Sequence, residues 1–234
     1  MRVQDQPAYI LHHRPFRDTS QILEILSLDY GRLSLMSRGS RAAKSRLKSV
    51  LQPFTPLLVN WSGKGEMPTL TGAEPRLVKA NYLSGKALPS AFYVNELLIR
   101  LLHKHDVHEE VYYLYESIIK LLAENQEIEP VLRLFEKQLL ELLGFGLNLL
   151  TNATTGKKVL PAVEYAYYLE HGPVELATVH DELYITRLSG QSLIDLDSNT
   201  LNSEQSLKDA KRLMRAILNY YLEGKPIKSR ELFR

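Results

Sequence analysis

The spacing of apolar residues changes near Pro75, and this change limits the possible folds more than any other feature. Upstream, apolar residues lie in short alternating runs between Gly and Pro residues, as in Arg32–Ser37. Alternation with a period of two is typical of strands with one buried face. Downstream, apolar residues recur every three or four positions, as in amphipathic helices. The sequence therefore predicts an α+β chain in which a β module precedes a helical module.

Five short strands are predicted within residues 1–80. The turn signal Asp29-Tyr30-Gly31 and the hairpin-like connection Ser62-Gly63-Lys64-Gly65 separate some of them. Short strands punctuated by Gly and Pro are typical of a small barrel such as the five-stranded OB fold, and an SH3-like barrel fits the pattern almost as well. The predicted strands are Ala8–His12, Ile22–Leu28, 33–37, Leu57–Trp61 and Pro68–Thr71.

A helical bundle domain is predicted over residues 81–234 because amphipathic segments follow one another with short connections. Strand-like stretches on either side of Gly172-Pro173 predict a small, irregular β-like insertion at about 150–190. The predicted helices run from Ser90 to about His105, from about Glu109 onward, from Pro130 to Gly144 and from about Glu204 to Glu223.

Charge is distributed unevenly along the chain. Residues 1–80 contain 12 Lys and Arg against 6 Asp and Glu, whereas residues 81–207 contain 9 against 18. No acidic residue occurs between Asp29 and Glu66, a window that holds seven cations. Such an asymmetry indicates a polyanionic partner at the basic end, although a basic run can also be a solvated face.

The acid-free window predicts a groove for single-stranded nucleic acid. Small barrels bind single strands through cations that follow the phosphates and aromatic rings that stack on bases. Tyr30 and Trp61 are candidate stacking residues, although half-buried barrel aromatics are an equally compatible interpretation. Contacts to phosphates would tolerate any base sequence and weaken with salt. The predicted DNA-binding residues of this module are Arg32, Arg38, Arg41, Lys44, Arg46, Lys48, Trp61 and Lys64.

A second basic feature lies near the end of the chain. Lys208, Lys211, Arg212 and Arg215 are spaced i, i+3, i+4 and i+7, which places them on one stripe of a helix. Like charges on one stripe repel one another, so they are predicted to contact DNA as well. A solvated helix face is the alternative.

A third stripe lies on the helix predicted from Pro130. Arg133 and Lys137 surround Leu140, away from the apolar face of that helix. Two cations beside a leucine suit a short acidic peptide with an apolar end. Contact with a neighbouring helix explains the same pattern, and the pattern alone favours that explanation.

Several function classes are excluded or disfavoured. The chain has no cysteine, which excludes disulfides, zinc ribbons and thiol catalysis. No apolar run approaches the ~20 residues of a membrane helix, and no secretory signal is expected. His103, His105 and His108 do not have the i, i+4 spacing of helical metal ligands. We therefore expect neither an active site nor a cofactor or metal.

Blocks of sequence in a consistent order resemble the RecO family of bacterial recombination mediator proteins. Together they extend over nearly the whole chain, so the resemblance is specific. The blocks are Ala8–Ser20, Gly31–Arg41, Leu51–Leu57, Gly63–Glu66, Ala73-Glu74, Tyr93–Leu97, Leu132–Glu136, Leu143–Gly146 and Gly224–Leu232.

The resemblance implies an OB fold followed by a helical domain, and a function in recombinational DNA repair without catalysis. Family members bind single- and double-stranded DNA, anneal complementary strands and act with RecR to replace single-stranded-DNA-binding protein by RecA. Members of the cysteine-free kind dock the acidic, Phe-ended tail of that binding protein on the helical domain, a role that the resemblance assigns here to Arg133, Lys137 and Leu140. Many members hold a four-cysteine zinc site, but residues 151–169 contain no cysteine, so zinc is not expected. A cytoplasmic, nucleoid-associated protein is implied.

Two other classes remain open from the residues alone. An RNA-binding OB module would use the same cations. A metal-dependent nuclease would need converging carboxylates, and the sequence gives no clear sign of them.

Overall fold

The computed structural model describes residues 1–76, 82–124, 127–180 and 182–233. The chain divides into two compact units, of which the first comprises Met1–Asn125 with Ile227–Arg234 and the second Gln126–Pro226. The domain boundary predicted at residue 80 lies within 77–81, outside the described residues. The first unit combines the β module with two helices and the C-terminal segment.

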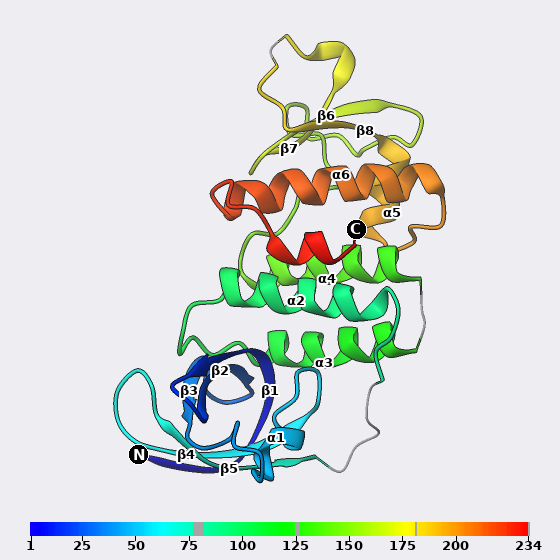
Figure 1. Cartoon of the computed structure of the whole chain (residues 1–234). Coiled ribbons are helices and arrows are strands. Elements are labelled where there is room, and N and C mark those ends of the chain that lie inside the picture. Colours follow the sequence, from blue (N-terminus) through cyan, green and yellow to red (C-terminus); the bar gives the residue numbers. More distant parts are fainter. Residues whose placement is uncertain (77–81, 125–126, 181, 234) are drawn as a thin grey trace. The chain divides into compact units, whose positions relative to one another are not determined.

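Five strands in the first unit close into a barrel in the order β1-β2-β3-β5-β4 (Figure 1). All neighbours are antiparallel except β3 and β5, which pair in parallel at Met36 and Thr69. This confirms the predicted five-stranded module and is compatible with the OB fold. The strands are β1 (Arg2–Phe16), β2 (Ser20–Ser27), β3 (Gly31–Ser37), β4 (Leu57–Ser62) and β5 (Thr69–Pro75).

Strand β1 is longer than the predicted Ala8–His12 because it pairs with two different strands. It pairs with β2 along its second half and with β4 along its first half. The pairing register shifts between Val3 and Gln6 and again between Ile10 and His12. Such bulges bend a strand, which lets β1 close the barrel on both sides.

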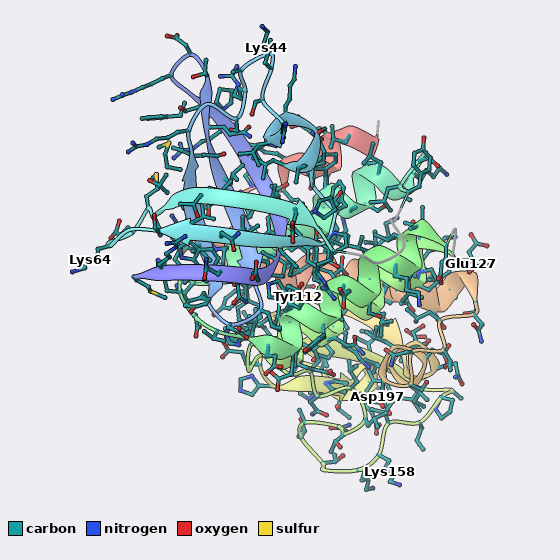
Figure 2. All side chains as sticks on the ribbon, turned by 90° about the horizontal axis from the view of Figure 1, so that it is seen from below. Lys44, Lys64, Tyr112, Glu127, Lys158 and Asp197 are labelled. Atoms are coloured by element: carbon teal, nitrogen blue, oxygen red, sulfur yellow. The ribbon has the colours of Figure 1, made fainter. Side chains whose placement is uncertain are left out.

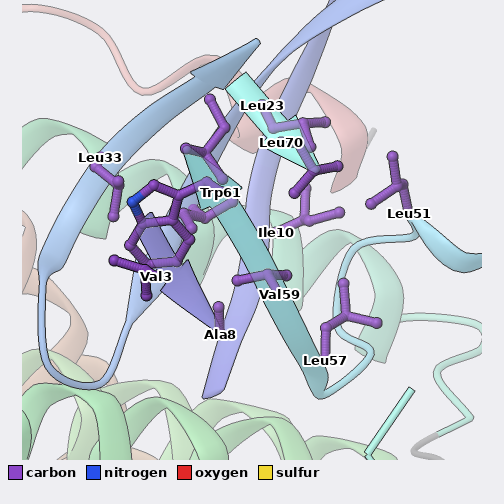
Figure 3. Packing of buried hydrophobic residues seen from close by; sticks show 12 residues of the cluster. Val3, Ala8, Ile10, Leu23, Leu33, Leu51, Leu57, Val59, Trp61 and Leu70 are labelled. Carbon is purple, nitrogen blue, oxygen red and sulfur yellow. The ribbon is translucent and has the colours of Figure 1, made fainter. Parts of the chain in front are cut away.

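Alternating apolar side chains fill the barrel (Figure 3). The short helix α1 (Leu47–Val50) packs Leu47 and Val50 against this cluster. Burial of this apolar surface is the main force that holds the barrel closed. The buried cluster consists of Val3, Ala8, Ile10, Leu23, Ile25, Leu33, Leu35, Leu51, Leu57, Val59, Trp61 and Leu70.

Hydrogen bonds fasten the barrel to α2 (Ala87–Leu101) and α3 (Glu109–Ala123) in the same unit. The hydroxyl of Tyr9 on β1 donates to Glu116 at 2.8 Å. Burial, with help from Glu116, raises the pKa of this hydroxyl well above its usual value, so it stays a donor. Asn95 donates to the Leu11 carbonyl at 2.8 Å and accepts from the Tyr115 hydroxyl at 2.8 Å. These buried polar groups satisfy one another and fix the seating of the barrel on the helices.

The second unit consists of helices and a small sheet (Figure 1). Strand β6 pairs antiparallel with both β7 and β8, which confirms the predicted β-like insertion. Helix α6 packs against α4, α5 and β8. The elements are α4 (Ile128–Leu142), β6 (Glu164–Tyr168), β7 (Gly172–Glu175), the short 3₁₀ helix η1 (Leu176–Thr178), β8 (Thr186–Ser189), α5 (Gly190–Asp197) and α6 (Glu204–Tyr221).

The C-terminal 3₁₀ helix η2 (Lys228–Phe233) is held on α2 by one carboxylate. Glu96 accepts hydrogen bonds from the backbone N–H groups of Lys228 at 2.9 Å and Ser229 at 2.7 Å. Burial alone would raise the pKa of Glu96, but the hydrogen bonds from Ser229 and Lys228 and the charge of Arg100 outweigh it and lower this pKa.

We expect Glu96→Gln to lower the free energy of unfolding by about 1 kcal/mol at pH 7, because a charge-assisted acceptor is lost. A carboxylate with a lowered folded pKa stabilises the fold above its unfolded value of 4.5, and this contribution is lost as pH falls through the folded pKa. Urea unfolding of variant and wild type should therefore differ at pH 7, and the difference should disappear as pH falls below 4.5 and through the lowered folded pKa. Glu66→Gln, which changes an exposed loop carboxylate, is the control and should show no such convergence. A gap of constant size between Glu96→Gln and wild type would contradict the assignment.

Candidate nucleic-acid interface

A basic loop, residues 38–48, runs from the end of β3 into α1 and presents five cations to solvent, of which Lys48 lies in α1 itself. No ion pair involves any of them within the described residues. Figure 2 shows Lys44 extending outward from the barrel. Because no described carboxylate neutralises them, these side chains can bind an anion without first breaking an ion pair. The five cations are Arg38, Arg41, Lys44, Arg46 and Lys48.

The backbone of the basic loop is fixed to the barrel. The N–H of Arg41 donates to the Thr19 carbonyl at 2.8 Å, and one guanidinium nitrogen of Arg41 donates to the carbonyls of Arg17 and Asp18 at 3.3 and 3.4 Å. Ser40 is fully buried and donates to the Ser37 carbonyl at 3.2 Å. The cations therefore stand on an ordered support, which lowers the entropy that binding would cost.

Two exposed cations outside the predicted set are Arg14 and Arg17, of which Arg17 lies next to this loop. They belong to β1 and to the turn that joins it to β2, and Arg41 reaches that turn. Both residues lie outside the acid-free window, and Asp18 follows Arg17 directly. The charge pattern of the sequence therefore did not indicate them as DNA-binding residues. Only the pairing of the strands brings the turn and the loop together.

Lys64 lies apart from the basic loop. It is exposed in the connection between β4 and β5. Figure 2 shows Lys64 and Lys44 pointing away from the barrel at well-separated places. The structure therefore does not place Lys64 in the same cluster.

The prediction that Arg32 is free to bind DNA is wrong, because this side chain is occupied inside the first unit. Its guanidinium pairs with Glu24 at 3.0 Å, and its Nε donates to the Leu102 carbonyl at 3.1 Å. The side chain is 12% exposed. Gly31 lies so close to this connection that an added Cβ would come within 2.0 Å of the Asp106 carbonyl oxygen. Arg32 therefore joins β3 to the segment between α2 and α3.

The prediction that Trp61 stacks on bases is also wrong for this structure. Trp61 is 2% exposed and lies in the barrel interior near Val3 and Leu33 (Figure 3). The half-buried Tyr30 packs edge-on against it, with ring centroids 5.1 Å apart. Neither face of the indole is open to a base, so the alternative of a barrel aromatic is the correct one.

Carboxylates compensate most of the stripe on α6. Lys208 pairs with Glu204 at 2.6 Å, and Lys211 pairs with Glu129 at 2.6 Å. Arg212 pairs with Asp209 at 2.7 Å and also donates to Thr186 at 2.7 Å. Arg215 is exposed and makes no ion pair with any described residue. The expected repulsion along the stripe is therefore wrong for three of its four members.

The three residues assigned to tail docking are buried, so that assignment is corrected as well. Arg133, Lys137 and Leu140 are 6%, 5% and 0% exposed. Arg133 pairs with Glu136 at 2.7 Å, while Lys137 donates to the carbonyls of Leu196 at 3.2 Å and Asp197 at 2.6 Å, near the C-terminal end of α5. A cation at a helix C-terminus satisfies carbonyls that lack helical partners. These side chains stabilise the second unit and offer no open surface.

Two further findings bear on the class of function. Within residues 1–76, 82–124, 127–180 and 182–233, no group of three or more His, Asp or Glu side chains could hold a metal ion. In the same ranges, none of the helices has the length and apolar character needed to span a membrane.

Comparisons with known proteins match both halves of the chain. Residues 1–77 match the family model described as Recombination protein O N terminal, and residues 83–231 match the one described as Recombination protein O C terminal. A DNA repair protein RecO from Nitrosococcus oceani is 42% identical over 232 residues, which cover 99% of this chain and 93% of that protein. The proteins of the same name from Methylococcus capsulatus and Aliivibrio fischeri are 40% and 42% identical, covering 97% of this chain and 91% and 94% of theirs.

We expect the fluorescence of Trp61, the sole tryptophan, to stay unchanged when single-stranded DNA is added, because the buried ring meets no base. Trp61→Phe should lower the free energy of unfolding by about 2 kcal/mol through the cavity it leaves. Its affinity for DNA should stay within about twofold of wild type, since no stacking is lost. Quenching of Trp61 by DNA, together with loss of affinity in the variant, would restore the stacking role.

We expect Arg133→Met to destabilise the protein by about 3 kcal/mol, because it removes the cation that faces the 1%-exposed carboxylate of Glu136. The double variant Arg133→Met/Glu136→Leu should recover most of this loss, since neither charge then remains buried without the other. Urea unfolding of the wild type, both single variants and the double variant measures the coupling. Strictly additive effects would show that the pair is not the stabilising contact.

Proposed function

The chain belongs to the RecO family of DNA repair proteins, and from this premise we propose that it is a non-enzymatic recombination mediator that binds DNA through its basic loop. The observation that carries the proposal is the set of five exposed loop cations, which no carboxylate of the described residues neutralises. The proposed role places the protein at the nucleoid.

Electrostatics supports binding to both single and double strands. A cation that neutralises a phosphate releases the condensed counterions around it, whatever the base sequence. Residues 1–80 carry a net charge of +6, which would steer a polyanion toward this module. Arg215 on α6, in the second unit, is a further exposed cation without an ion pair among the described residues. Affinity should therefore tolerate many sequences and fall with added salt.

Annealing follows from the same physics. Two complementary strands repel each other as polyanions, and a cationic surface that holds one of them lowers the cost of bringing up the other. Base pairing then supplies the free energy, so the step needs no nucleotide hydrolysis. We propose that the protein anneals strands in this way and that, together with RecR, it helps replace single-stranded-DNA-binding protein by RecA.

The acidic, Phe-ended tail of single-stranded-DNA-binding protein is the second partner that we propose, on grounds of family membership. Arg133, Lys137 and Leu140 cannot be its exposed contacts in this structure because all three are buried.

Reversing the charge of two loop cations tests the DNA-binding proposal. Arg38→Glu/Lys44→Glu should weaken binding to a fluorescent single strand at least about tenfold at moderate salt, because two phosphate contacts become repulsive. The slope of log affinity against log salt should shrink by about 1.4, and the rate of strand annealing should fall in parallel. Fluorescence anisotropy at several salt concentrations measures both the affinity and the slope.

Lys157→Glu/Lys158→Glu is the matched control. Both lysines are exposed in the second unit and make no ion pair within the described residues, and the change in net charge is the same. This variant should keep nearly all of the affinity. If it loses as much affinity as the loop variant, net charge and not the loop accounts for binding. Equal competition by RNA and single-stranded DNA would instead favour a general nucleic-acid-binding module.

A further inference from the structure

A cavity of about 290 Å³ opens beside the basic loop, where β1 and β2 meet the segment that leads into and out of α1. Its size lies close to the lower limit of about 300 Å³ for small-molecule sites. Arg41 and Lys48 line one part of it, and the uncharged side chains of Gln21, Gln52 and Leu51 line another. The cavity therefore combines cations with neutral hydrogen-bonding groups and an apolar wall.

Gln21 is the most informative of these residues. It is 7% exposed, and its carboxamide makes no hydrogen bond within the described part of the chain. Its side-chain N and O are not among the described buried polar atoms that lack a partner, so the carboxamide reaches solvent although most of the residue is buried. A ligand can therefore replace water at these atoms. Gln21 lines the cavity, and a carboxamide has one acceptor and two donors with which it can bind a molecule there.

Other neutral groups extend this recognition surface. The Nε2 of Gln52 donates to the Lys48 carbonyl at 2.8 Å, which fixes the carboxamide and leaves its oxygen available. Leu51 is 2% exposed and supplies an apolar wall. Burial, with a smaller effect of His12, lowers the pKa of His13, so this ring lines the cavity in its neutral form at pH 7.

Carboxamides beside an apolar wall suit the edge and face of a nucleobase. Glutamine and asparagine read base edges through paired donors and acceptors, and apolar or planar groups cover the ring face. Arg41 and Lys48 at the same cavity suit the phosphate of the same nucleotide. The anchoring of Arg41 to the carbonyls of Arg17 and Asp18 holds its guanidinium in place.

We propose that this cavity holds one unpaired nucleotide of a DNA single strand, with its base against Gln21 and Leu51 and its phosphate against Arg41 and Lys48. The inference rests on the proposed function and deepens it, because it assigns a site that distinguishes single strands from duplexes. In a duplex the bases are stacked and paired, and extruding one costs free energy. A single strand can insert a base without breaking a pair.

Gln21→Leu tests the site. The substitution keeps the volume similar and breaks no side-chain hydrogen bond within the described residues, so the barrel should stay folded. Affinity for a fluorescent 20-nucleotide single strand should fall roughly fivefold to tenfold, as expected for one lost bidentate base contact. Affinity for a blunt duplex of the same length should not change. An oligomer of abasic units, which keeps the phosphates without the bases, should bind wild type and variant equally.

Gln6→Leu is the matched control. Gln6 is also a buried glutamine of the barrel, 4% exposed with an unpaired Nε2, but it does not line the cavity. Its substitution should leave the affinities for single strand and duplex unchanged. A loss with Gln6→Leu equal to that with Gln21→Leu would overturn the proposal, because it would trace the effect to the barrel as a whole.

Gln52→Leu is a second, independent test of the site, because Gln52 is exposed and its replacement does not disturb the core. It should also weaken single-strand binding and spare the duplex. The proposal is overturned if both cavity variants bind the single strand like wild type, or if they lose single strand, duplex and abasic oligomer alike. Failure of wild-type protein to bind any DNA would instead reject the proposed function on which the site rests.

Discussion

The first unit depends on a single bent strand that completes the barrel on both sides. Strand β1 pairs with β2 and β4, and its two bulges let one continuous segment curve around the apolar cluster. The same strand carries Tyr9 and Leu11, whose hydroxyl and carbonyl bond to Glu116 and Asn95 on the adjacent helices. Closure of the barrel therefore depends on this strand, which also contributes two of the hydrogen bonds that attach the barrel to α2 and α3, in addition to the bond from Arg32 on β3.

The barrel also holds the backbone of the basic loop in place, and this determines how the loop can bind an anion. The loop is bonded through Arg41 to the turn after β1 and through Ser40 to the end of β3. The backbone of the loop is therefore ordered, whereas no described carboxylate pairs with its cations. A polyanion meets phosphate-binding groups that need little rearrangement, and the adjacent cavity adds neutral groups that a phosphate backbone alone would not use.

Whether a cation is available depends on the carboxylates near it in space. Arg32 is in the acid-free window of the sequence, yet Glu24 on the neighbouring strand neutralises it. The α6 stripe is equally basic in sequence, yet Glu129 reaches Lys211 from α4, while Glu204 and Asp209 pair with their neighbours along the helix. The loop cations that follow Ser37 are not neutralised by a described carboxylate, because the loop leaves the sheet. Within the sheet, each residue faces a fixed partner on the neighbouring strand.

The sequence by itself determined the α+β class, the five-stranded module, the β-like insertion and the exposed basic loop. These features follow from local periodicity, from turn residues and from a run of charges that is too long to bury. All three signals depend only on residues close together in the chain. Only the tertiary structure decided that Trp61 faces the barrel interior, that Arg32, Arg133 and Lys137 are bound internally, and that Gln21 lines a cavity with Arg41. Those outcomes depend on contacts between residues far apart in the chain, where one strand register or one helix packing selects the partner.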